Sequence, residues 1–308
     1  MHEGSKKAIV AAFFANLGIA VSKFVAFLFT GAASMLAESI HSLADTGNQG
    51  LLMLGTKRAS RPADESHPFG YSMSRYFWAF IVALVLFTLG GVFAIYEGTD
   101  KLLHPHELES PAWAISVLGF AVLLEGYSFR TALKEAKPLL RGKSMLAFVR
   151  RSKSPELPVV LLEDSGALLG LVIALSGVVA AVITGNPRWD AAGSLAIGIL
   201  LVIIAVILAV EMSSLLIGEA ADEEEVAALK VAIANGPHFK RLIHLRTMQL
   251  GPDDVLVAAK VEYSDTLSVH DLASAIDATE VHIRAAVPDA KMVFIEPDVY
   301  RVPVVNSD

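Results

Sequence analysis

Three side chains that bind metals or protons lie within one apolar stretch, Ala33–Leu54. Glu38, His41 and Asp45 follow one another at intervals of three and four residues, and such side chains lie on one face of an α-helix. A charged side chain at the centre of a bilayer costs about 2.5–3.5 kcal/mol even on the most lenient scale, so an ionisable group there indicates function. Imidazole and carboxylate groups are ligands for zinc and its first-row neighbours. The stretch therefore predicts a divalent-metal site inside a membrane.

A second acidic pair, Glu163 and Asp164, lies near the start of another apolar stretch. A helix rises about 1.5 Å per residue, so in a core about 30 Å thick His41 lies roughly 12 Å and Asp45 roughly 18 Å from the outer surface. The acidic pair lies roughly 8–9 Å from the inner surface, close to the level of Asp45. Zinc prefers four ligands. Three of the predicted ligands are His41, Asp45 and Asp164, and the fourth is Glu163, Glu38 or water.

The composition of the chain agrees with a location in a membrane. Of its 308 residues, 54% are hydrophobic and 19% are charged, which is too apolar for an ordinary soluble protein of this length. The chain has no cysteine, so His, Asp and Glu are the strong metal ligands left, and a soft copper(I) site is disfavoured. We expect no catalytic site, no organic cofactor and no nucleic-acid partner.

Six apolar stretches are long enough to cross a lipid bilayer, which takes about 20 residues. Basic residues gather in the connections near residues 57–75 and 134–153, and the positive-inside rule then places both termini in the cytoplasm. No signal peptide and no Arg-rich transit peptide is recognisable, so we predict a multi-pass protein of a bacterial plasma membrane. The six predicted spans are Ala8–Phe29, Ala33–Leu54, Tyr76–Tyr96, Ala112–Leu133, Pro158–Thr184 and Asp190–Ile217.

The composition changes to that of a soluble domain at residue 218. We therefore divide the chain into a transmembrane domain, residues 1–217, and a cytoplasmic α+β domain, residues 218–308. The order helix, strand, strand, helix, strand favours a small ferredoxin-like fold. The predicted elements are a helix in residues 221–237, antiparallel strands at Arg241–Leu250 and Val255–Tyr263, a helix capped by Ser268 and ending near Ala286, and a strand at Lys291–Glu296.

Several motifs together resemble the cation diffusion facilitator family. These are the six spans, His-x-x-x-Asp in the second span, an acidic pair in the fifth, and an α+β tail. The loop RPADESHPFGYSMSRYFWAF is similar to that family's connection between the second and third spans, where His-x-Phe-Gly is typical. Within the family, ESIHSLADT, LLEDS and VFIEPD look most like the branch of the ninth human zinc transporter.

The resemblance implies a homodimer that exchanges zinc, or another divalent cation such as Mn²⁺, Fe²⁺, Co²⁺ or Cd²⁺, against protons and carries it out of the cytoplasm. It gives His41, Asp45 and Asp164 the positions of metal ligands. One position departs from the pattern, because Val160 stands where the family usually has a fourth ligand. The fourth contact then falls to Glu163, Glu38 or water.

The resemblance also raises the question of metal sites outside the membrane. Some family members bind a second metal in the loop through one Asp and two His. Asp64 and His67 fit this pattern, but Tyr71 stands at the place of the second His, so the resemblance implies a weak site at best. The tail lacks the strand histidines of metal-binding relatives, and we interpret its own histidines as ordinary surface or strand residues.

Two other functions remain open at this point. The pair Glu38-x-x-His41 fits half of the motif of di-iron carboxylate enzymes, which need a second Glu-x-x-His on another helix; this chain has none. A chain whose site is damaged at Val160 would instead be a non-transporting scaffold partner. Asn48 and the other polar residues of the spans are candidates for interhelical hydrogen bonds as much as for function.

Overall fold

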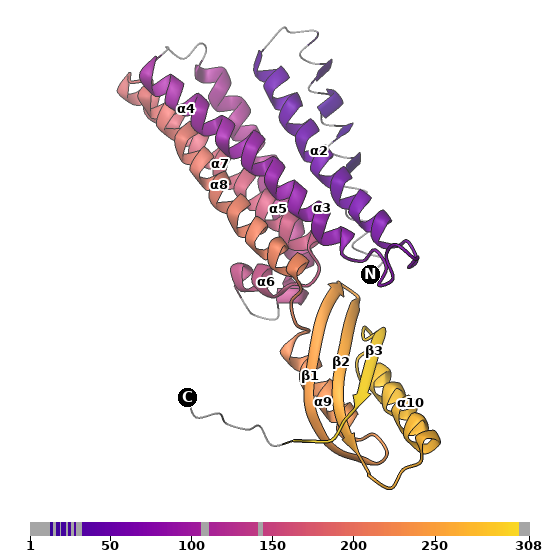
Figure 1. Ribbon diagram of the computed structural model, residues 1–308. Coiled ribbons are helices and arrows are strands. Elements are labelled where there is room, and N and C mark those ends of the chain that lie inside the picture. Colours follow the sequence, from indigo (N-terminus) through magenta and orange to yellow (C-terminus); the bar gives the residue numbers. More distant parts are fainter. Residues whose placement is uncertain are drawn as a thin grey trace. The chain divides into compact units, whose positions relative to one another are not determined.

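The computed structural model describes residues 13–14, 17–18, 20–22, 24–25, 28, 33–105, 111–140 and 144–301 (Figure 1). The chain forms two compact units. The first contains Met1–Pro62 and Ser74–Ser213, and the second contains Ala63–Met73 and Ser214–Asp308. The connection between the second and third predicted spans therefore belongs to the second unit, which the sequence does not indicate.

Helices make up the described part of the first unit. The third predicted span is one continuous helix, Ser74–Leu103, in which a π-helical stretch, η1, separates two α-helices. The second, fourth, fifth and sixth predicted spans are also helical. The bounds are α2 Ala33–Ala59, α3 Ser74–Val85, η1 Leu86–Val92, α4 Phe93–Leu103, α5 Pro111–Leu140, α6 Met145–Arg151, α7 Glu156–Thr184 and α8 Arg188–Ile217.

Three helices within the described residues are long and apolar enough to cross a membrane: Ser74–Leu103, Glu156–Thr184 and Arg188–Ile217. A shorter apolar helix covers Ala114–Tyr127. Large apolar side chains on these helices are exposed, as lipid-facing residues are; Leu123 and Ile183 are examples. The first predicted span, Ala8–Phe29, lies mostly outside the described residues, so the count of six spans stays a prediction.

Glycines allow α8 to lie close to both α4 and α7. A Cβ atom on Gly98 of α4 would lie 2.7 Å from the backbone nitrogen of Leu195 on α8. A Cβ atom on Gly166 of α7 would lie 2.6 Å from Cδ1 of Ile204, also on α8. Small residues at such crossings are the usual means by which membrane helices pack, because lipid supplies no hydrophobic force between them.

The second unit contains a three-stranded sheet with strand order β1-β2-β3 (Figure 1). β1 and β2 are antiparallel, and β2 and β3 are parallel. The predicted order helix, strand, strand, helix, strand is confirmed, while the ferredoxin-like assignment stays a prediction. The bounds are α9 Glu223–Ala234, β1 Phe239–Gly251, β2 Asp254–Tyr263, α10 Val269–Ala286 and β3 Met292–Pro297.

The core of this unit follows from the alternation of residues along β2. Val255, Val257 and Val261 point to one face and are fully buried, because side chains of a strand alternate between its two faces. Leu229 of α9 and Ile283 of α10 pack into the same cluster, so both helices cover this face. The predicted cap of the second helix is confirmed: the hydroxyl of Ser268 accepts a hydrogen bond from the backbone N–H of Asp271.

Candidate metal site

The predicted ligands of the second span all lie on α2. Its backbone is helical from Ala33 to Ala59, so Glu38, His41 and Asp45 occupy one stripe along this helix. Their side chains lie outside the part of the chain that the structure describes. Asn48 continues the same stripe, three residues after Asp45 and seven after His41, and its side chain is described.

Asn48 joins α2 to α7 at the acidic pair. Its Nδ2 donates a hydrogen bond of 2.8 Å to Oε1 of Glu163, and the side chain of Asn48 is buried, with 4% exposed. The interhelical hydrogen bond considered for Asn48 from the sequence is therefore confirmed. Glu163 and Asp164 are themselves partly buried. One carboxylate of the pair thus reaches the stripe of α2 that carries His41 and Asp45.

The bond also fixes the level at which the two helices meet. Counting from Ala33, Asn48 lies roughly 22 Å along α2, which is roughly 8 Å from the far surface of a core about 30 Å thick. Glu163 lies roughly 8 Å from that surface when counted from Pro158. Asp45 is one turn from Asn48, about 4.5 Å along the axis. The contact therefore lies within one helical turn of Asp45 and beside Asp164, and about two turns from His41.

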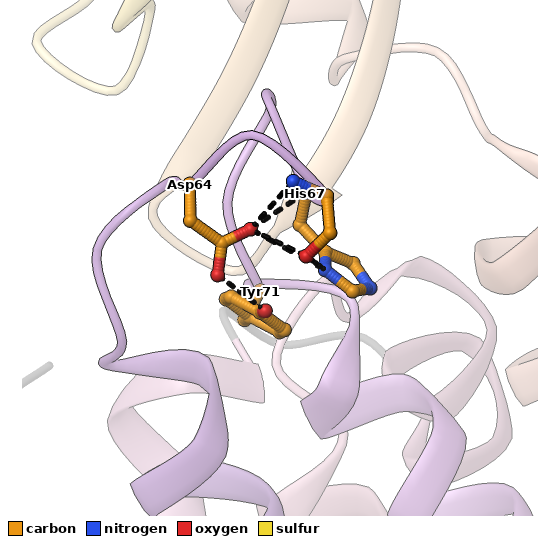
Figure 2. Close-up of polar contacts among 4 residues, drawn as sticks. Asp64, His67 and Tyr71 are labelled. Atoms are coloured by element: carbon orange, nitrogen blue, oxygen red, sulfur yellow. Dashed lines mark hydrogen bonds and ion pairs between the residues drawn. The ribbon is translucent and has the colours of Figure 1, made fainter.

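The loop Ala63–Met73 brings together Asp64, His67 and Tyr71 (Figure 2). Oδ1 of Asp64 accepts hydrogen bonds from the backbone N–H groups of Ser66 and His67, at 3.0 and 2.8 Å, and from the hydroxyl of Ser66 at 2.7 Å. Oδ2 accepts a bond of 2.7 Å from the phenol of Tyr71. These donors stabilise the charged form, so they hold the pKa of Asp64 well below its usual range.

The imidazole of His67 lies beside both Asp64 and Tyr71. Its Nδ1 lies 3.6 Å from Oδ1 of Asp64, and its ring centroid lies 4.2 Å from that of Tyr71. Both carboxylate oxygens of Asp64 are engaged by groups of the loop itself. Among the residues that the structure describes, this loop included, no three or more His, Asp or Glu side chains gather as a metal site.

One feature of α3 and α7 does not emerge from the sequence. Arg75 and Glu156 form a buried ion pair between the first turns of these helices. The hydroxyl of the fully buried Tyr76 donates a 2.9 Å bond to the backbone carbonyl of Lys153. The sequence indicates for Arg75 only a basic charge in the connection near residues 57–75, because nothing local points to a partner 81 residues away.

The fold and the site together define a multi-span helical membrane protein with polar groups buried among its helices. A model of the cation efflux transmembrane domain matches residues 9–217. The chain therefore belongs to the cation efflux family, which is a family of transporters, and the predicted resemblance is confirmed. The di-iron enzyme and the scaffold are not favoured by this match.

The names of similar proteins support the assignment to this family. The human "Proton-coupled zinc antiporter SLC30A9, mitochondrial" is 35% identical over 263 residues, which are 85% of this chain and 46% of the relative. "Metal tolerance protein C4" of Arabidopsis thaliana is 29% identical over 87% of this chain and 59% of its own length. "Cation-efflux pump FieF" of Shewanella oneidensis is 26% identical over 91% of this chain and 90% of its own length. The chain spans about half the length of the human relative.

The prediction of a bacterial plasma membrane is wrong on these comparisons. The human relative is named as mitochondrial, and a plant protein is among the better matches. The prediction depended on the absence of a recognisable transit peptide. That absence carries no weight here, because this chain aligns with less than half of the human protein.

Proposed function

We propose that this protein carries a divalent cation, zinc first, across its membrane in exchange for protons. The cation binds between α2 and α7, with His41, Asp45 and Asp164 as ligands. The observation that supports this most is the hydrogen bond between Asn48 and Glu163. It joins the helix of the His-x-x-x-Asp stripe to the helix of the acidic pair, at the depth where the ligands of both helices can share one ion.

The same bond favours Glu163 over Glu38 as the further ligand. The carboxylate of Glu163 already reaches the stripe of α2 at Asn48. Glu38 lies ten residues from Asn48 on α2, about 15 Å along the helix axis. A cation held near Asp45 and Asp164 is therefore closer to Glu163.

Proton exchange follows from the chemistry of these ligands. Metal ligands must be deprotonated, so a bound cation releases protons and protons displace the cation. Zinc bound by Asp45 and Asp164 gives a site of zero net charge, which lowers the cost of holding the ion inside a membrane. Glu163 adds a third carboxylate, and a proton on it restores neutrality.

The ligands come from two helices, so a change in the packing of α2 relative to α7 exposes the ion to one side or the other. Transporters commonly alternate between two such arrangements around a site near the middle of the bilayer. We further propose that the protein is a homodimer and that residues 218–308 contribute to the dimer contact, as the family resemblance implies.

The experiment is zinc uptake into reconstituted vesicles that contain a zinc-sensitive dye. Uptake is expected to rise when the lumen is made acidic, because protons leaving the lumen drive zinc in. Asp164→Asn is expected to abolish uptake at every pH. Asp100→Asn is the matched control, since Asp100 is an exposed acid at the end of α4 that pairs with His104. Uptake that ignores the pH gradient would overturn the exchange, and normal uptake by Asp164→Asn would overturn the site.

A further inference from the structure

The side-chain amide of Asn48 makes a hydrogen bond through its nitrogen but not, among the described residues, through its oxygen. Its Nδ2 donates to Glu163. Its Oδ1 is buried and has no hydrogen-bond partner among the described residues. The NH₂ end therefore faces Glu163 and the carbonyl oxygen faces elsewhere. This is the orientation that an ionised carboxylate requires, since such a group accepts hydrogen bonds and cannot donate them.

A buried carbonyl oxygen without a partner is unusual. Nearly all buried polar atoms in folded proteins are paired, and a membrane interior offers no bulk water to replace a missing partner. Such an atom carries a desolvation cost that a ligand can relieve. A divalent cation is a partner that an oxygen of this kind can bind, since carboxylate and carbonyl oxygens are common ligands of hard cations.

The position of this oxygen agrees with that of the proposed ion. Asn48 is on the stripe of His41 and Asp45, one turn from Asp45. Its side chain touches the acidic pair of α7 through Glu163. Val160, on α7, has no atom that can bind a metal, so that residue supplies no ligand, and Oδ1 of Asn48 would be a ligand beside Glu163.

We propose that Oδ1 of Asn48 is a direct ligand of the transported cation. This inference rests on the proposed function and adds a residue to its site. Asn48 acts twice: its NH₂ group holds the carboxylate of Glu163 in place, and its carbonyl oxygen binds the ion. A neutral oxygen adds coordination without adding charge. It favours cations that prefer oxygen, such as Mn²⁺, more than it favours Zn²⁺.

The test measures metal binding by the full-length purified protein, with Co²⁺ absorption as the probe and Zn²⁺ and Mn²⁺ as competitors. Asn48→Leu keeps the size of the side chain and removes both polar ends. It is expected to weaken Mn²⁺ binding about 10–100-fold and Zn²⁺ binding less, and to change the Co²⁺ spectrum. Gln49→Leu is the matched control. Gln49 is also buried on α2, and its amide oxygen has no hydrogen-bond partner among the described residues, but it points about 100° away around the helix.

Asn48→Asp distinguishes loss of a ligand from loss of folding. It keeps an oxygen at the same place and adds charge, so it is expected to bind Co²⁺ and to shift the preference between Mn²⁺ and Zn²⁺. Wild-type affinity and spectrum in Asn48→Leu, with binding abolished in Asp164→Asn, would show that the site exists without Asn48. Unchanged binding in both variants would overturn the proposed site itself. If Asn48→Leu does not fold, an unchanged spectrum and metal preference in Asn48→Asp would overturn the inference.

Discussion

Two regions of the molecule place a carboxylate beside polar groups: the contact between α2 and α7, and the loop Ala63–Met73. They differ in whether a polar atom is left without a hydrogen-bond partner. In the loop, both oxygens of Asp64 accept hydrogen bonds from Ser66, His67 and Tyr71. Between the helices, Glu163 meets an amide whose own oxygen has no partner among the described residues. A ligand atom must be free to bind, so we propose the metal site at the second arrangement although the first has more polar contacts.

The solvent exposure of the two regions also favours the contact between α2 and α7 as the metal site. Asp64 and His67 are about half exposed, so water competes with any ion there and the loop needs no ion to satisfy its polar groups. Asn48 is almost fully buried, and polar atoms inside a membrane protein without partners are costly. The loop carboxylate stabilises its own turn, whereas the oxygen of the buried amide is the atom that we propose to bind the cation.

The largest expected effect is on zinc transport, when carboxylates of the two regions are removed in turn. Asp45→Ala or Asp164→Ala should reduce zinc transport about 100-fold or more, because each removes a charged ligand and direct ligands matter at least as much as their supporting partners. Asp64→Ala should leave most transport intact. Vesicle uptake of zinc measures all three, with size-exclusion profiles as the check on folding. Equal losses in all three variants would remove the distinction between the regions.

The next largest effect is on zinc affinity, and it distinguishes Glu163 from Glu38 as the further ligand. Glu163→Gln should weaken zinc binding about 10–100-fold, because the side chain reaches α2 beside the proposed ion. Glu38→Gln should change affinity less, since it lies about 15 Å along α2 from the contact at Asn48. Competition with a fluorescent zinc chelator gives both affinities. A larger loss in Glu38→Gln would reverse the assignment, and equal small losses would indicate water.

A gain of function tests why the loop is a poor metal site. Tyr71→His replaces the phenol that binds Oδ2 of Asp64 and places a second imidazole beside His67. The loop would then offer one carboxylate and two imidazoles, a ligand set that zinc accepts. We expect one additional zinc per chain in a binding titration, with transport little changed. Tyr71→Phe is the control, because it removes the hydroxyl without adding a ligand, and it should bind no additional zinc.

The smallest expected effect concerns the pKa of Asp64. The hydroxyl of Tyr71 is one of the donors that lower this pKa, so Tyr71→Phe should raise it toward the ordinary value of about 3.9. A lowered pKa in the folded state stabilises the fold above the unfolded pKa, and this contribution is lost as the pH falls through the folded pKa. The variant should therefore lose the contribution of Asp64 at a higher pH than the wild type. NMR titration of the carboxyl carbon measures the shift, and an unchanged pKa would show that the phenol bond is unimportant.

The structural predictions succeeded where local periodicity decided the outcome. The spacing of Glu38, His41 and Asp45 places them on one stripe of a helix because 3.6 residues make a turn. The alternating valines of β2 and the cap at Ser268 likewise follow from rules that act over a few residues. The membrane compartment was predicted wrongly, because that prediction depended on the absence of a recognisable transit peptide, and no helical or strand period bears on it.

The sequence by itself determined the apolar helices, the strands of the second unit and the stripe of metal-binding residue types. Only the tertiary structure decided that Asn48 and Glu163, 115 residues apart, share a hydrogen bond, that Arg75 pairs with Glu156, and that the loop after α2 belongs to the second unit. The physical reason is that a helical or strand period fixes which face a side chain occupies. Which faces then meet depends on the packing of whole elements, through contacts such as those of Gly98 and Gly166 with α8, and no local pattern encodes that packing.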